Sequence, residues 1–149
     1  RLPESLWDLY CGVGGFALAA ARAGFPRVTG VEVSSGAISS AISAARHAGL
    51  SRSAASFIAD DATAWARAQS PEDVPDVIVV NPPRRGIGAD LAAYLNECAA
   101  PRVIYSSCNP ASLATDLAAM PTLRPVEGRV FDMFPHTTHA EVALLLERA

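Results

Sequence analysis

The sequence has little charge and, in particular, no excess of basic residues. Charged side chains make up 18% of the 149 residues, whereas an average globular chain has about 25%. The net charge is -3. A domain that binds nucleic acid by itself usually has a basic surplus. A polyanionic partner would therefore have to be held by a local basic patch or by chain outside this sequence.

Long apolar runs and paired cysteines are also missing. No apolar stretch reaches the roughly 18 residues of a membrane span, and no signal-peptide pattern is present. The three cysteines, Cys11, Cys98 and Cys108, lack disulfide or metal-ligand spacing. An odd number of such cysteines favours free thiols in a reducing compartment. We therefore expect a cytoplasmic protein with no metal site and no membrane association.

Apolar runs rich in valine and isoleucine alternate with alanine-rich segments at helical spacing. We expect strands at 6–11, 27–33, 55–59, 76–81 and 102–107, and helices at 15–24, 36–48, 61–69, 89–99 and 111–119. This repeated order predicts a mostly parallel sheet with right-handed crossovers. Two β-rich runs follow without a helix, at 125–135 and 140–148, and predict an antiparallel pair at the sheet edge. The expected fold class is α/β, a doubly wound sheet whose ligands bind at the carboxyl ends of the strands.

The first expected strand runs into a glycine-rich turn within DLYCGVGGF, residues 8–16. Gly12, Gly14 and Ala17 fit the pattern G-x-G-x-x-A, in which glycines let the backbone approach a ligand closely. Glu32 ends the second strand about twenty residues later, where an acid can accept both hydroxyls of a ribose. This pair of features suits NAD and S-adenosylmethionine equally. A plain tight turn with a solvated acid remains the alternative.

Two other strand ends carry polar residues. After the third strand, one carboxylate of Asp60 and Asp61 could accept an adenine amino group, or could cap the next helix. After the fourth strand, NPPRRGIG (81–88) holds the Asn81 side chain on a stiff loop. Arg84 and Arg85 add local positive charge there. The loop is either a ligand-binding element or a rigid turn with solvated arginines.

The fifth strand ends in VIYSSCNP, residues 103–110, which places a thiol between buried strand and open loop. A free cysteine is often a small buried hydrophobe. Cys108, however, is surrounded by Ser106, Ser107 and Asn109, and a reactive thiol needs a polar, accessible setting of this kind. Cys108 is therefore a candidate nucleophile, whereas Cys11 and Cys98 are expected to be ordinary buried thiols.

Four stretches taken together, DLYCGVGGF, NPPRRGIG, SSCNP and FDMFPHTTHAE, resemble the S-adenosylmethionine-dependent RNA uracil-C5 methyltransferases. The resemblance spans about residues 7–147 and is closer to the ribosomal RNA branch than to the tRNA branch. It implies a Rossmann-like class I methyltransferase fold with S-adenosylmethionine as cofactor. It also implies an RNA substrate, 23S ribosomal RNA in preference to tRNA.

The resemblance also implies roles for individual residues. Cys108 would add to C6 of the uracil, and Glu141 would be the base that takes the C5 proton. The implied cofactor contacts are Asp8, Tyr10, Gly12, Gly14, Glu32, Asp61 and Asn81. Family members have an upstream RNA-binding part, in several cases with an iron–sulfur cluster. The resemblance thus implies that residues 1–149 are a catalytic domain from a longer protein.

Some residues and functions stay open at this point. Phe131 and Phe134 are candidates to hold a base that has been flipped out of its RNA stack. His136 and His139 lack further ligands, so a zinc site is not expected. Besides a tRNA uracil-C5 methyltransferase, three alternatives remain: an exocyclic-amine nucleobase methyltransferase, an NAD-binding oxidoreductase domain, and a cofactor-binding fragment that is inactive by itself.

Overall fold

Strands and helices alternate along the chain as the sequence pattern predicts. The structure is a computed structural model that describes residues 1–132, 136 and 140–149. The chain forms two compact units, Arg1–Val79 and Val80–Ala149. The elements that begin before the boundary are β1 (Ser5–Leu9), α1 (Gly15–Arg22), β2 (Arg27–Glu32), α2 (Ser35–His47), β3 (Ala55–Ala59), α3 (Ala62–Ala68), the 3₁₀ turn η1 (Pro71–Asp73) and β4 (Val77–Val80). After it come α4 (Gly88–Glu97), β5 (Arg102–Ser107), α5 (Pro110–Ala118), β6 (Leu123–Phe131) and β7 (Glu141–Arg148).

The strands follow the order β3-β2-β1-β4-β5-β7-β6 in a seven-stranded sheet. In the first unit, β2 pairs in parallel with β1 and with β3. In the second unit, β7 pairs antiparallel with β5 and with β6. The prediction of an α/β sheet, mostly parallel with an antiparallel C-terminal pair, is therefore confirmed.

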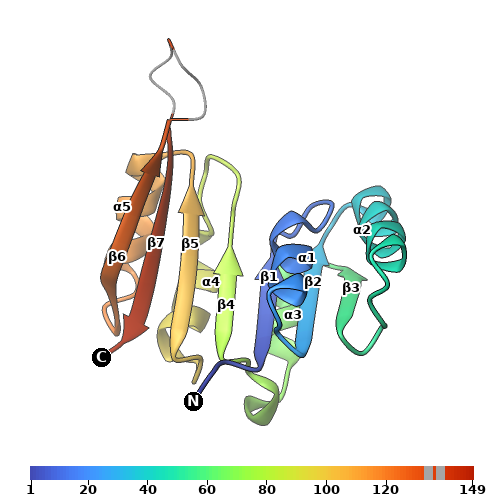
Figure 1. The fold of residues 1–149 in the computed structure, drawn as a ribbon. Coiled ribbons are helices and arrows are strands. Elements are labelled where there is room, and N and C mark those ends of the chain that lie inside the picture. The colour runs from blue at the N-terminus through green and yellow to red at the C-terminus, as the bar shows by residue number, and fades with distance from the viewer. Residues whose placement is uncertain (133–135, 137–139) are drawn as a thin grey trace. The chain divides into compact units, whose positions relative to one another are not determined.

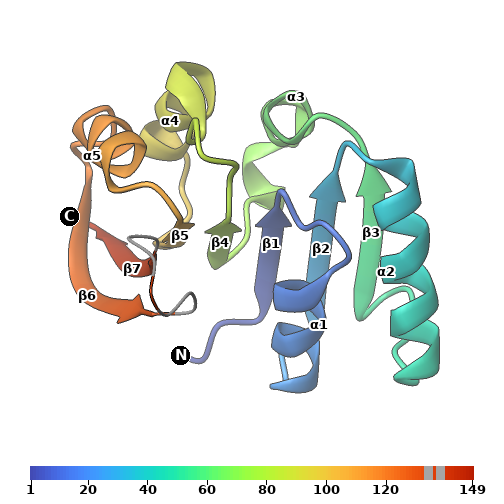
Figure 2. The same ribbon diagram turned by 90° about the horizontal axis from the view of Figure 1, so that it is seen from above.

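Helices cover both faces of the strands in the first unit. Figure 2 shows α1 and α2 on one face of β1–β3 and α3 on the other. Side chains alternate between these faces along each strand. Trp7 of β1 meets Trp65 of α3 edge to face, with ring centroids 4.8 Å apart. Leu9 and Val31 are completely buried and belong to the apolar core of this unit.

The first strand ends two residues earlier than predicted. Its predicted range was 6–11, but β1 covers Ser5–Leu9. Tyr10 has a φ of 64°, in the left-handed region that an extended strand cannot contain. The amide of Cys11 still donates to Val31 O at 3.0 Å, so the chain stays beside β2 as it enters the glycine turn.

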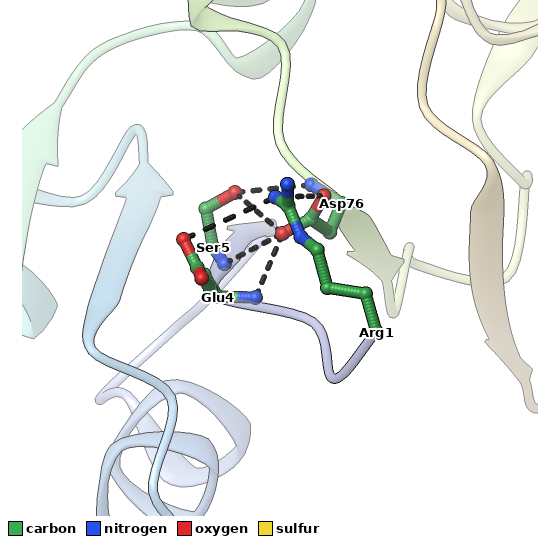
Figure 3. A network of polar contacts seen from close by, with 4 residues as sticks. All are labelled: Arg1, Glu4, Ser5 and Asp76. Carbon is green, nitrogen blue, oxygen red and sulfur yellow. Dashed lines mark hydrogen bonds and ion pairs between the residues drawn. The ribbon is translucent and has the colours of Figure 1, made fainter.

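The start of β1 is tied to the residue before β4 by a polar network around Asp76 (Figure 3). The carboxylate of Asp76 accepts from the amides of Glu4 at 2.7 Å and Ser5 at 3.2 Å. The amide of Asp76 donates in return to Ser5 Oγ at 3.1 Å. The Glu4 amide, helped by the Ser5 amide and by Arg1, lowers the pKa of Asp76 below its ordinary value. These bonds align the amino ends of two strands whose carboxyl ends lead into predicted site residues.

The second unit places its last strand between two earlier ones. In Figure 1, β7 lies between β5 and β6, and Figure 2 shows α4 and α5 on the same face of these strands. Val103, Tyr105 and Leu146 are completely buried. Within residues 1–132, 136 and 140–149, no helix has the length and apolar character needed to cross a membrane.

Candidate active site

The turn after β1 has the backbone geometry of a ligand cradle. Gly12 has a φ of 55° and Gly14 a φ of 92°, conformations that side chains other than glycine's rarely adopt. A Cβ at Gly14 would meet the Phe57 ring at 3.0 Å and Ala41 Cβ at 3.1 Å. The turn therefore requires glycine both for its conformation and for the close approach of α2 and β3, and α1 starts directly after it.

Glu32 is held against this turn from the end of β2. One carboxylate oxygen accepts the Gly12 amide at 3.2 Å, and the other accepts the Ser34 amide at 2.8 Å. Each oxygen of an ionised carboxylate can accept a second hydrogen bond. The fixed carboxylate can thus receive a vicinal pair of hydroxyls, as a ribose offers.

Asp8 is completely buried in β1 and is only partly satisfied. Its Oδ2 accepts the Ala17 amide of α1 at 3.0 Å, while its Oδ1, which is also buried, has no hydrogen-bond partner among the residues that the structure describes. Burial raises the pKa of Asp8 to about 7, against the opposing effect of the Ala17 amide. A buried, unpaired acceptor beside the glycine turn fits a ligand with a cationic or hydrogen-bond-donating group. The turn, Glu32 and Asp8 together fit the ribose and ammonium groups of S-adenosylmethionine.

Tyr10 and Asp61 lie at the ends of β1 and β3 in the same unit. Tyr10 is half-buried. Asp61 is exposed and caps α3, because its Oδ1 accepts the Ala64 amide at 2.8 Å. Asp60 accepts the amide of Asp61 at 2.7 Å. The capping alternative from the sequence is therefore realised for Asp61, and a contact of Asp61 with an adenine stays a prediction.

In the second unit, the loop after β4 is fastened to the segment that carries Cys108. Asn81 is half-buried at the start of this loop. The carbonyl of Arg84 accepts from Asn109 Nδ2 at 2.9 Å and from Ser112 Oγ at 2.8 Å. The backbone of the loop is thus fixed, while the side chain of Arg84 is exposed.

Cys108 follows β5 directly and is a free, half-buried thiol. Asn109 caps α5, since its Oδ1 accepts the Ala111 amide at 3.1 Å. Ser107 Oγ bonds both the amide and the carbonyl of Asn109, at 3.0 Å each. These short-range bonds define the turn in which the thiol lies. Its setting is polar and accessible, as a nucleophile requires.

Strand register places Glu141 close to Cys108. Ser107, the last residue of β5, pairs with Val142 of β7, so Cys108 and Glu141 are each the next residue beyond this pair. On the other side of β7, Glu141 pairs with Phe131 of β6, whose side chain is 45% exposed. The Glu141 carboxylate therefore lies between an exposed aromatic ring on β6 and the end of β5, which the Cys108 thiol directly follows.

The other two thiols differ in burial: Cys11 is buried as expected, whereas Cys98 is half-buried like Cys108, so the expectation of a buried Cys98 is wrong. Cys11 is 7% exposed, and burial, with the nearby Asp8 and Glu32 carboxylates, raises its pKa to about 12. Burial also raises the pKa of Cys98. A raised pKa leaves little thiolate at neutral pH, so both are poor nucleophiles.

The sequence did not predict two contacts that shape this site, that of Ser106 with Glu141 and those made by Asp116. Ser106 of β5 donates to Glu141, and Asp116 of α5 accepts from the Ile87 amide and from Tyr105. A serine beside the candidate cysteine was a visible signal for the first contact, but the partner depends on strand register. Asp116 has no comparable signal, because an acid on a helix usually faces water.

Two earlier candidates lie outside the described residues, namely Phe134 and His139. His136 is described and exposed, with a φ of 70°. Across the described part of the chain, no group of three His, Cys, Asp or Glu side chains is placed to hold a metal ion.

Two family models match the chain. The model described as tRNA (uracil-5-)-methyltransferase matches residues 72–149, which include Asn81, Cys108 and Glu141. The model described as RNA cap guanine-N2 methyltransferase matches residues 4–95, which include the glycine turn and Glu32 but neither Cys108 nor Glu141. The second match therefore extends over the predicted cofactor contacts of the first unit and stops before the thiol.

Curated relatives cover nearly the whole chain. A protein of Shewanella amazonensis named 23S rRNA (uracil(747)-C(5))-methyltransferase RlmC is 49% identical over 144 residues, 97% of this chain. The protein of the same name from Halothiobacillus neapolitanus is 50% identical over 147 residues, 98% of this chain. The chain spans only 37% and 38% of the lengths of these two relatives.

Solved structures agree on the fold. The tRNA (uracil-54, C5)-methyltransferase of Pyrococcus abyssi, in complex with S-adenosyl-L-homocysteine, matches with a TM-score of 0.84 and 32% identity over 96% of this chain and 34% of its own. The magnesium protoporphyrin IX methyltransferase of Synechocystis, with bound SAM, matches over 97% of this chain and 69% of its own with a TM-score of 0.73. At 17% identity this second likeness concerns the fold alone.

Proposed function

Because the chain belongs to the tRNA (uracil-5-)-methyltransferase family, we propose that it methylates C5 of a uridine in RNA with S-adenosylmethionine as methyl donor. The observation that carries this proposal is the strand register at Glu141, which pairs with Phe131 of β6 and precedes Val142, the partner of Ser107 directly before Cys108. This register brings a carboxylate and an aromatic ring to the end of the strand that the thiol follows, and these are the groups that covalent chemistry on a pyrimidine requires.

The first unit would hold the cofactor, which supplies an electrophilic methyl group when bound. Glu32 would accept the ribose hydroxyls while keeping its bonds to the turn. Asp8 would direct its unpaired Oδ1 to the ammonium group. Gly12 and Gly14 would bring the backbone close to the ligand. Tyr10, Asp61 and Asn81 are proposed as further contacts on the family resemblance alone.

Cys108 would begin the reaction on the uracil. Its thiolate adds to C6, so that negative charge develops on O4 and C5 becomes a carbon nucleophile. Once C5 has gained the methyl group, a carboxylate oxygen of Glu141 takes the C5 proton. The C5–C6 double bond then re-forms, the C6–Sγ bond breaks and Cys108 leaves as thiolate. Phe131, exposed next to Glu141, offers a surface on which the flipped base can stack.

We propose 23S ribosomal RNA as the substrate in preference to tRNA. The relatives named for 23S rRNA reach 49% and 50% identity, whereas the structure named for tRNA has 32%. We also propose a cytoplasmic location, supported by the three free cysteines and by the RNA substrate.

The decisive experiment is to trap the covalent adduct. The chain is incubated with S-adenosylmethionine and 23S rRNA transcripts that contain 5-fluorouridine, beside parallel tRNA transcripts, and is analysed by mass spectrometry. Fluorine at C5 cannot leave as a proton, so a methylated adduct on Cys108 should accumulate. Cys108→Ala should abolish the adduct, whereas Cys98→Ala should retain it.

The RlmC of Shewanella amazonensis serves as the positive control for the RNA. An adduct with rRNA that is absent with tRNA supports both parts of the proposal, and the reverse preference would overturn the choice of substrate. If the control reacts and this chain gives no adduct with either RNA, the proposed activity of the chain is wrong.

A further inference from the structure

Ser106 makes a direct contact with the carboxylate that we assign as the base. Its Oγ donates a hydrogen bond to Glu141 Oε2 at 3.1 Å, across 35 residues of sequence. Ser106 lies on β5 opposite Ala143 of β7, and Glu141 is two residues earlier on β7. The contact is therefore a diagonal one on a single face of the β5–β7 pair, where side chains two residues apart point the same way.

The residues around Ser106 and Glu141 offer these two side chains no alternative hydrogen-bond partner within the described part of the chain. Ser106 is 7% exposed, and the neighbouring positions on its face are the apolar Ile104, Ala143 and Leu145. In the part of the chain that the structure describes, neither the Ser106 hydroxyl nor the Glu141 carboxylate has another hydrogen-bond partner. A buried hydroxyl without a partner is costly, so the interior of this face favours the bonded arrangement.

We propose that Ser106 is a positioning residue that orients Glu141 for removal of the C5 proton; this inference rests on the proposed function. The Ser106 hydroxyl engages Oε2 and leaves Oε1 to accept the proton. Glu141 is the first residue of its strand and is half-buried, so its side chain would otherwise sample several rotamers. A hydrogen bond to an ionised acceptor is among the stronger ones in proteins and restricts this sampling.

The role concerns only one step of the reaction. Addition of Cys108 to C6 and formation of the C5–CH₃ bond precede the transfer of the C5 proton to Glu141. Loss of Ser106 should therefore slow the elimination and leave the earlier steps intact. The adjacent Ser107 provides the contrast, because its hydroxyl bonds Asn109 beside the nucleophile and not Glu141.

The first test needs no catalysis. The carboxyl ¹³C resonance of Glu141, assigned by comparison with Glu141→Gln, is recorded at a single pH in the wild-type chain, Ser106→Ala and Ser106→Thr. We expect the resonance to move in the alanine variant and to return in the threonine variant, which keeps the hydroxyl and suits a strand. A resonance that stays in place in Ser106→Ala would overturn the proposal.

The second test follows single turnover on 23S rRNA transcripts with ordinary uridine. In Ser106→Ala we expect elimination to slow by about 10- to 100-fold, with accumulation of the methylated Cys108 adduct, and unchanged transfer of the methyl group. Ser106→Thr should recover most of the rate. Equal losses in methyl transfer and elimination, or no loss in either, would overturn the positioning role. A wild-type chain that forms no adduct would contradict the proposed function instead, and the carboxyl resonance would still decide whether Ser106 holds Glu141.

Discussion

Tyr105 donates a hydrogen bond to the carboxylate of Asp116, and both side chains are buried in the second unit. The same carboxylate oxygen accepts the Ile87 amide at 2.9 Å. Gly86 packs so closely against this oxygen that a Cβ there would overlap it. One acid therefore joins β5, α5 and the loop that starts at Asn81, at the level of the segment that carries Cys108.

Removing this acid should be costly for stability. In Asp116→Ala the Ile87 amide loses its acceptor and Tyr105 loses one hydrogen bond, and a buried donor left unpaired costs about 1–3 kcal/mol. We expect the free energy of unfolding to fall by about 2–4 kcal/mol in urea titrations. Tyr105→Phe removes one donor and leaves the acid in place, so its loss should be smaller. A larger loss in Tyr105→Phe than in Asp116→Ala would contradict this account.

The glycine turn offers a matched pair of substitutions. Gly14→Ala forces a left-handed φ on a residue with a Cβ, which would also press on Phe57 and Ala41. Gly15 starts α1 and has open space around its Cβ position. We expect Gly14→Ala to lose about 1–3 kcal/mol of unfolding free energy and Gly15→Ala to gain up to about 1 kcal/mol. Thermal and urea unfolding of the two variants measure this difference directly, and equal effects would show that the turn tolerates a side chain.

Asp8 should make stability depend on pH. Its pKa in the folded chain is raised from 3.8 to about 7, so between these values the folded state keeps a proton that the unfolded chain releases. The free energy of unfolding should therefore fall as the pH rises through this window and level off above it. The expected fall is roughly 2–4 kcal/mol.

The neutral variant Asp8→Asn should lack this slope. Unfolding free energies at pH 5 and pH 8 are compared for wild type and Asp8→Asn, with the exposed Asp90→Asn as control. We expect the control to keep the wild-type slope. A slope that survives in Asp8→Asn would mean that another group is responsible.

The three thiols should differ in reactivity. With iodoacetamide at pH 8, we expect Cys108 to be modified first, because it is accessible in a polar turn. Cys11, buried and with a pKa of about 12, should react roughly 100-fold more slowly or not at all. Peptide mapping over time gives the order, and Cys108→Ser should remove the fast phase. Labelling of Cys11 at a similar rate would contradict the burial described for it.

Elements with strong periodicity could be predicted from the sequence. The range predicted for β3 matches Ala55–Ala59, and Ser34 caps α2 as one of two candidates. Both signals are local, since they depend on alternation or on a single hydroxyl before a helix. The end of β1 was predicted wrongly. Tyr10 adopts a left-handed backbone conformation that the turn requires, and a tyrosine gives no sign of this conformation in the sequence.

The connections within the candidate site could be predicted only in part. Cys108 and Glu141 were singled out from motifs, but their arrangement depends on the register between β5 and β7, which pairs residues 35–45 positions apart. The burial of Asp8 and its unpaired oxygen depend on how α1 packs on β1. Such properties arise from tertiary packing and cannot be predicted from the order of residue types along the chain.

The place of β7 between β5 and β6 has a consequence for how the protein is made. During translation, β5, Cys108 and β6 are synthesised before β7, the strand that lies between β5 and β6 in the folded sheet. Until β7 inserts, the thiol has no neighbouring carboxylate and two strand edges are open to other chains. The proposed nucleophile and the proposed base can thus come together only after β7 has been synthesised, and a nascent chain that ends before β7 exposes the thiol without the carboxylate.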